Sequence, residues 1–156
     1  MPSLPQEVVD LIESGVSILV GTRNADLRPA TVRGVGALVG SDHRSVTVFL
    51  PKQTAGQAIP NLRDNGEIAV GFSRPHDHLA VQLKGRCSEL RMARAEEQPI
   101  TLRYAIAFAE TTYTVGMPRS LINRMNVWPA WAASFEVRDI FSQTPGPGAG
   151  KRWEAR

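Results

Sequence analysis

The feature that most constrains the fold is a stretch of the chain in which short apolar runs alternate with turn residues. It spans residues 28–85 and reads as strand, strand, short helix, strand, strand, over 30–39, 45–51, 54–65, 67–73 and 79–85. In the last two runs apolar and polar residues alternate, which is typical of a strand with one buried face. Short strands with tight connections and a single helix predict a small antiparallel barrel.

The remaining segments extend this barrel. Residues 16–22 and 132–141 predict two further strands, and 5–14 predicts a short amphipathic helix. Helix formers dominate 93–125, whereas the Pro- and Gly-rich segment after Gln143 excludes regular structure. We therefore expect a mainly β fold, a Greek-key-like barrel with peripheral helices, in one domain over residues 1–156. Its core covers about 16–90 and 130–142, with a helical insertion at about 93–125 and an extended tail at 143–156.

Composition narrows the classes of protein. The net charge of +3 is mild, and the basic residues are scattered, so nothing demands a nucleic-acid partner. A lone cysteine, Cys87, excludes an intrachain disulfide framework and fits a reducing compartment. No apolar run approaches the ~20 residues of a membrane span, and residues 1–20 lack a basic signal-peptide start. We expect a cytoplasmic protein that binds neither membrane nor nucleic acid.

The strand at 30–39 carries the first candidate for binding. Three glycines, Gly34, Gly36 and Gly40, indicate strong curvature or close approach of another backbone or a ligand. Alternation puts Arg33 and Val35 on one face. A guanidinium beside small residues can clamp a phosphate with two hydrogen bonds. The alternative is an arginine on the surface of a barrel strand.

Other candidates surround the predicted helix and the last strand of the stretch. Thr54 can cap the helix at 54–65, and with Gln57 it lies where free amides attract anions. Gln82 and Lys84 share one strand face and can reach a ring carbonyl or a phosphate; an outward polar face is the alternative. His76, Asp77 and His78 predict a solvated turn, because zinc needs three or four converging ligands. No metal site is expected.

The order of these segments resembles the FMN-binding split-barrel superfamily, whose best-known member is pyridoxamine 5'-phosphate oxidase. The resemblance covers roughly 16–89. It includes the Arg28-Pro29 turn before the Arg33 strand, the run Val-Thr-Val-Phe-Leu-Pro ending at Pro51, and the Asn-Leu-Arg-Asp-Asn step from Asn61 to Asn65 before an apolar strand. The closing segment 143–150 is similar to small bacterial members of the family.

This resemblance implies a homodimer with flavin mononucleotide (FMN) at the subunit interface. In the family an arginine on the second strand and a Ser/Thr with a Lys or Arg near the helix start hold the phosphate. Arg33 and Thr54 match the first two roles, and Gln57 stands near the position of the basic residue, for which Lys52 or Lys84 can substitute. The cofactor-binding residues implied are Arg33, Val35, Phe49, Leu50, Lys52, Thr54, Gln57, Gln82 and Lys84.

The leading hypothesis is therefore an FMN-dependent oxidoreductase acting on a small molecule, with the chemistry supplied by the cofactor. The tail lacks the Trp and Arg arrangement of the vitamin B6 enzymes, so pyridoxamine phosphate is not expected as the substrate. Two alternatives stay open. One is a non-catalytic binding or sensor module that retains the barrel; the other is a relative that binds haem or the deazaflavin F420.

Overall fold

The computed structural model describes residues 2–153 and confirms a mainly β fold with peripheral helices. In these residues an antiparallel sheet has the strand order β2-β1-β5-β6-β7-β4-β3. The strands are β1 Ser17–Arg23, β2 Pro29–Arg33, β3 Ala37–Val39, β4 Ser45–Pro51, β5 Glu67–Ser73, β6 Ala80–Met92 and β7 Ala130–Ser142. The helices are α1 Gln6–Ile12, α2 Ala58–Asp64, the 3-10 turn η1 Ala95–Glu97, α3 Gln98–Tyr113 and α4 Arg119–Ile122.

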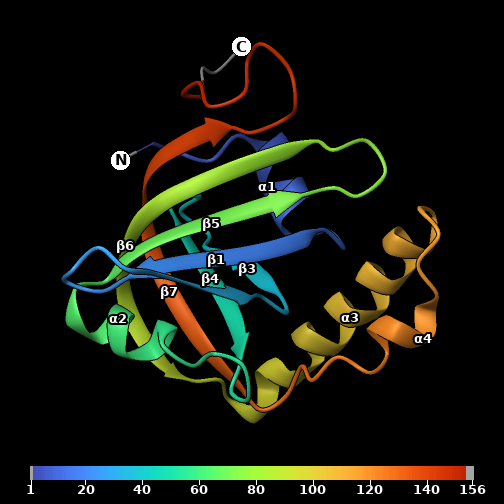
Figure 1. The fold of residues 1–156 in the computed structure, drawn as a ribbon, viewed down its shortest axis with the longest axis horizontal. Helices are drawn as coiled ribbons and strands as arrows, with labels where there is room; N and C mark the ends of the chain where they lie inside the picture. The colour runs from blue at the N-terminus through green and yellow to red at the C-terminus, as the bar shows by residue number, and fades with distance from the viewer. Residues whose placement is uncertain (1, 154–156) are drawn as a thin grey trace.

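The two ends of the sheet are joined by the chain between β2 and β3. The Gly34 N–H donates to Ile18 of β1 at 2.9 Å, and the Val35 N–H donates to Phe49 of β4 at 2.8 Å. Gly36 has a φ of +150° and accepts from the Phe49 N–H at 3.0 Å. The expectation of one continuous strand over 30–39 was therefore wrong, because the chain changes partner from β1 to β4 at these glycines. In Figure 1, β6, β5 and β1 run side by side in front of β7 and β4.

The core lies between these two layers. Phe49, Phe72 and Phe135 are fully buried there. Buried and less buried residues alternate in β1 and in β5, and for β5 the sequence pattern predicted this alternation. The opposite face of β1, β5 and β6 points out of the barrel, and it carries Ser17, Leu19, Gly71 and Gln82. This outward surface is called the outer face below.

Helix α2 packs against β1 and β2. Its buried Asn61 donates to the Thr22 hydroxyl at 3.0 Å, which fixes the helix to β1. The expectation that Thr54 caps this helix was wrong: α2 begins at Ala58, so that Pro60 falls in its first turn, where the missing N–H costs nothing. Gly66 follows the end of the helix and has a φ of +72°. Glycine adopts this left-handed conformation readily, which is why it commonly ends helices.

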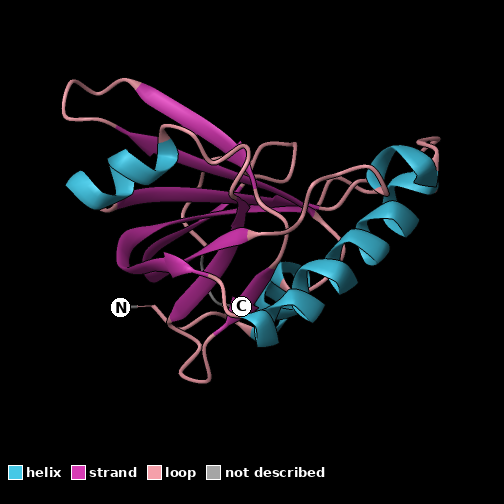
Figure 2. Ribbon diagram, turned by 90° about the horizontal axis from the view of Figure 1, so that it is seen from below, coloured by secondary structure: helices cyan, strands magenta, loops and turns pink. Residues whose placement is uncertain are grey.

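The segment predicted to be a helical insertion contains α3 and α4, which lie on the far side of the barrel from α2 (Figure 2). Close packing attaches α3 to the start of β1. A Cβ at Gly15 would lie only 2.4 Å from the Ala107 carbonyl carbon, so glycine is required at this contact. One turn away, the buried Tyr104 hydroxyl donates to the Val16 carbonyl at 2.7 Å, and burial raises the pKa of Tyr104.

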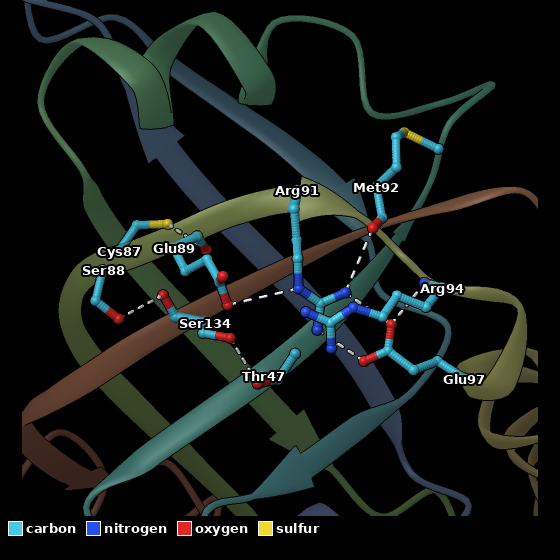
Figure 3. A network of polar contacts seen from close by, with 9 residues as sticks. All are labelled: Thr47, Cys87, Ser88, Glu89, Arg91, Met92, Arg94, Glu97 and Ser134. Atoms are coloured by element: carbon cyan, nitrogen blue, oxygen red, sulfur yellow. Dashed lines mark hydrogen bonds and ion pairs between the residues drawn. The ribbon is translucent and has the colours of Figure 1, made fainter.

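A polar network attaches the insertion to the end of β6 (Figure 3). Arg91 donates twice to the Glu97 carboxylate, with both distances 2.8 Å, and the Arg94 N–H donates to the same group at 2.7 Å. Hydrogen bonds from Arg91 lower the pKa of Glu97 to about 2. The ion pair thus fixes the direction in which the chain enters α3.

The edge of β3 is covered by a side chain from the end of α1. The Val39 N–H donates to the Glu13 carboxylate at 2.9 Å, on the side of β3 away from β4. None of the helices in residues 2–153 has both the length and the apolar character needed to cross a membrane.

Candidate functional site

The strand register places four of the outward residues in one row across the outer face. Arg33 of β2 lies opposite Leu19 of β1, which lies opposite Gly71 of β5, which lies opposite Gln82 of β6. With about 4.8 Å between neighbouring strands, Arg33 and Gln82 are about 14 Å apart along this row. Two of the predicted site residues therefore lie at the two ends of one surface.

Arg33 lies exposed at the β2 end of the row. Its guanidinium donates to the Ser17 hydroxyl at 3.0 Å and lies 5.8 Å from the centre of the Phe108 ring of α3. It forms no ion pair with an Asp or Glu among residues 2–153. Its charge is thus held in place by a hydroxyl and an aromatic ring, and remains available to an anion.

The part of the outer face between Arg33 and Gln82 has few large side chains and is mostly apolar. Leu19 is 46% exposed, an unusual value for a strand leucine in the middle of a sheet, and Gly71 beside it has no side chain. A hollow of about 160 Å³ opens here, and polar groups that can donate or accept hydrogen bonds line it, from Ser17, Ser73, Gln82 and Gln143. A flat ring with a polar edge fits such a surface.

The next residue across the sheet from Gln82 is Phe141 of β7, and two cations lie near its ring. The Lys84 ammonium lies 5.1 Å from the Phe141 ring centre, and the Arg152 guanidinium lies 5.6 Å from it. Arg152 comes from the C-terminal tail, which returns to the sheet through a bridge to Phe141, and it pairs with Asp139. Sequence reasoning missed Phe141 and Arg152 because no local pattern shows that the tail folds back.

The predicted phosphate-binding residues of the β4–α2 loop are exposed. Lys52, Thr54 and Gln57 all have accessible side chains, and the Gln57 amide donates to Asn61 at 3.2 Å. The loop leads into α2, which packs against β1, β2, β5 and β6. The structure contains no direct contact that joins Arg33 to the loop in residues 2–153, so their joint action on one anion stays a prediction.

The three apolar candidates need correction. Val35, Phe49 and Leu50 have no exposed surface at all. They lie where the chain crosses from β2 to β4, and their side chains pack the core. None of them can contact a cofactor on the outer face.

A second cleft, of about 270 Å³, lies between α1, β3 and α3. Glu13, Arg103 and Tyr104 line it together with the backbone of Gly36 and Ala37. Arg103 and Tyr104 were not selected from the sequence, because nothing beyond a helical insertion was predicted for 93–125. In residues 2–153 no cluster of His, Cys, Asp and Glu has the arrangement of a metal site.

Comparison with known proteins identifies the fold. The sequence matches no protein-family model and no curated protein. The structure, in contrast, matches HupZ of Group A Streptococcus with a TM-score of 0.56 and 24% identity, over 94% of this chain and 99% of that one. The chain has the split-barrel fold.

Two further solved structures agree with this identification. A pyridoxamine 5'-phosphate oxidase-like protein from Lactobacillus delbrueckii gives a TM-score of 0.58 at 14% identity, over 90% of this chain and 94% of that one. An F420 reductase gives 0.55 at 10% identity, over 88% and 98%. The similarity to these two structures thus extends over most of the chain. At such low identity the likeness is one of fold.

Proposed function

We propose that this split barrel binds a flavin-type cofactor, FMN in the first instance, and works as a cytoplasmic homodimeric oxidoreductase on a small molecule. The observation that carries the proposal is the outer-face row. In it, an arginine with no carboxylate partner among residues 2–153 and a glutamine amide flank a mostly apolar floor. Two solved structures have the same fold and are named as a pyridoxamine 5'-phosphate oxidase-like protein and an F420 reductase. These names support a cofactor of this class.

The residues present fit the chemistry of FMN. Arg33 would bind the phosphate, with the exposed hydroxyl of Thr54 and the ammonium of Lys52 as further donors from the β4–α2 loop. Leu19 and Gly71 would contact the ring, and Gln82 and Lys84 would face its polar edge. A cation near that edge stabilises a reduced, anionic ring. When bound, the flavin would supply hydride or electron transfer, and the barrel would position the ring and the substrate.

Titration of the purified protein with FMN tests the proposal, with quenching of flavin fluorescence as the readout. Riboflavin, which lacks the phosphate, is the matched ligand, and we expect it to bind at least tenfold more weakly. An absorption spectrum of the protein as purified would show any resident flavin or haem. No saturable binding of FMN, and no resident chromophore, would overturn the proposal.

The deazaflavin F420 is the second candidate, favoured by the F420 reductase of the same fold. F420 carries a longer anionic tail than FMN, so its binding would depend on more basic residues than Arg33 alone. Competition between F420 and FMN in the same titration separates the two. The cofactor that binds more tightly at equal ionic strength is the one the site fits.

A further inference from the structure

A second hollow opens on the outer face beside the cofactor row. Its volume is about 330 Å³, and β1, β5, β6 and β7 contribute to it. Gly21, which has no side chain, and Ala69, whose side chain is a single methyl group, form its floor, so no bulky side chain rises from it. Arg23, Lys84 and Arg138 stand around this floor, and we call the site the basic hollow.

Among residues 2–153, a carboxylate pairs with one of these three cations, Arg138. Arg138 pairs with Glu67 at 2.6 Å and 3.3 Å, and its hydrogen bonds lower the pKa of Glu67, so the two charges cancel. Arg23 donates to a backbone carbonyl, that of Asn24, at 3.2 Å. Lys84 lies over an aromatic ring. Neither of these two is within 4 Å of a carboxylate of residues 2–153.

The nearest carboxylate to Lys84 along the sheet is already engaged. Asp139 lies opposite Lys84 in the β6–β7 register, but it pairs with Arg152. The basic hollow therefore carries an excess of two positive charges, on strands that are two spacings, about 10 Å, apart. Such an excess raises the local concentration of anions and favours a ligand that meets both cations.

We propose that the basic hollow binds a small flat dianion, with one anionic group at Arg23 and the other at Lys84. A floor without bulky side chains selects a planar body, and the separation of the cations selects two acidic groups over one. Binding at this site does not require the cofactor. That the dianion is the substrate rests on the proposed function, because Lys84 also borders the cofactor row.

Isophthalate, a planar dicarboxylate, is the probe. We expect titration calorimetry at constant ionic strength to show saturable binding at least tenfold tighter than that of benzoate, which has one carboxylate, with no binding of the neutral isophthalamide. Arg23→Gln and Lys84→Met should each weaken isophthalate binding about tenfold or more, since each removes a charged hydrogen bond. Arg23→Lys should retain most of it.

Arg124→Gln is the matched control, an exposed arginine at the end of α4 far from the basic hollow. If Arg124→Gln and Arg23→Gln lose isophthalate affinity equally, the effect is one of overall charge, and the proposal is overturned. If isophthalate shows no saturable binding, the proposal is overturned as well. This holds even where the cause is a second copy of the chain that covers the hollow.

Titration of the same variants with FMN separates this proposal from the cofactor proposal. Arg23→Gln should weaken isophthalate and leave FMN affinity unchanged, and Arg33→Ala should do the reverse. If FMN fails to bind but isophthalate binding depends on Arg23, the basic hollow stands and the cofactor proposal falls. If Arg23→Gln weakens FMN and isophthalate alike, there is no separate dianion site.

Discussion

The Asn61 side-chain amide donates to the Thr22 hydroxyl at 3.0 Å, and both residues are buried. This bond joins helix α2 to the inner side of β1. The loop that carries Thr54 leads directly into α2, so the same bond also sets where that loop lies. A polar contact inside the barrel thereby positions groups that face solvent outside it.

We expect Asn61→Ala to lower the free energy of unfolding by about 1–3 kcal/mol, because it leaves the buried Thr22 hydroxyl without its donor. Urea denaturation followed by circular dichroism measures the loss. Thr22→Val in the Asn61→Ala background removes the unpaired hydroxyl and should recover part of the stability. A double variant as unstable as the sum of the two single changes would show that the residues do not act together.

Arg33→Ala is expected to weaken FMN binding by about 1–3 kcal/mol, or about 5–150-fold, the range for a hydrogen bond to a charged group. Fluorescence titration gives the dissociation constant. Arg28→Ala removes an exposed arginine just before the same strand and should leave affinity unchanged. A dissociation constant that Arg33→Ala does not alter would remove Arg33 from the cofactor site.

Glu97→Gln tests the ion pair at the entry to α3. The folded-state pKa of Glu97, about 2, lies below its ordinary value of 4.5. The carboxylate therefore stabilises the fold fully above pH 4.5, and this contribution is lost as the pH falls toward 2. The variant should be less stable than the native chain by about 1–3 kcal/mol at pH 7, with a difference that shrinks toward zero near pH 2. If the difference in unfolding free energy between the variant and the native chain does not change with pH, the charge of Glu97 is not what stabilises the fold.

Gly15→Ala tests the contact between α3 and β1. The new methyl would overlap the Ala107 backbone, so we expect α3 to shift and stability to fall by about 1–3 kcal/mol. Gly148→Ala is the control, because a Cβ there meets nothing within 4 Å. Thermal unfolding of both variants measures the effect. Equal melting temperatures for the two would mean that α3 is not held by this close approach.

The fold was predictable where the sequence pattern is local. Alternation in 67–73 and 79–85 predicted β5 and part of β6 correctly, and Gly66 predicted the end of α2. The change of partner at Gly34–Gly36 was read only as curvature, because which strands pair depends on residues far away in sequence. The extension of β6 to Met92 was missed for the same reason, since its last residues pair with β7 rather than with β5.

The candidate site was predictable in part. Alternation correctly predicted that Gln82 and Lys84 share one strand face. The prediction that Arg33 shares a face with Val35 was wrong, because the chain changes partner from β1 to β4 between these two residues. Val35, Phe49 and Leu50 were predicted as cofactor-binding residues, but they are buried. A resemblance to a family indicates which positions in the sequence correspond, but it does not show whether a side chain at such a position is exposed. Phe141 and Arg152 come together only through the return of the tail, which no periodicity encodes.

The Glu13 carboxylate on the Val39 N–H has a consequence for association between molecules. A three-residue strand at the end of a sheet offers free backbone groups to which a strand of another molecule can add. Here an approaching strand would have to displace a negatively charged side chain anchored on α1. Resistance to aggregation through β3 thus depends on one glutamate at the end of the first helix.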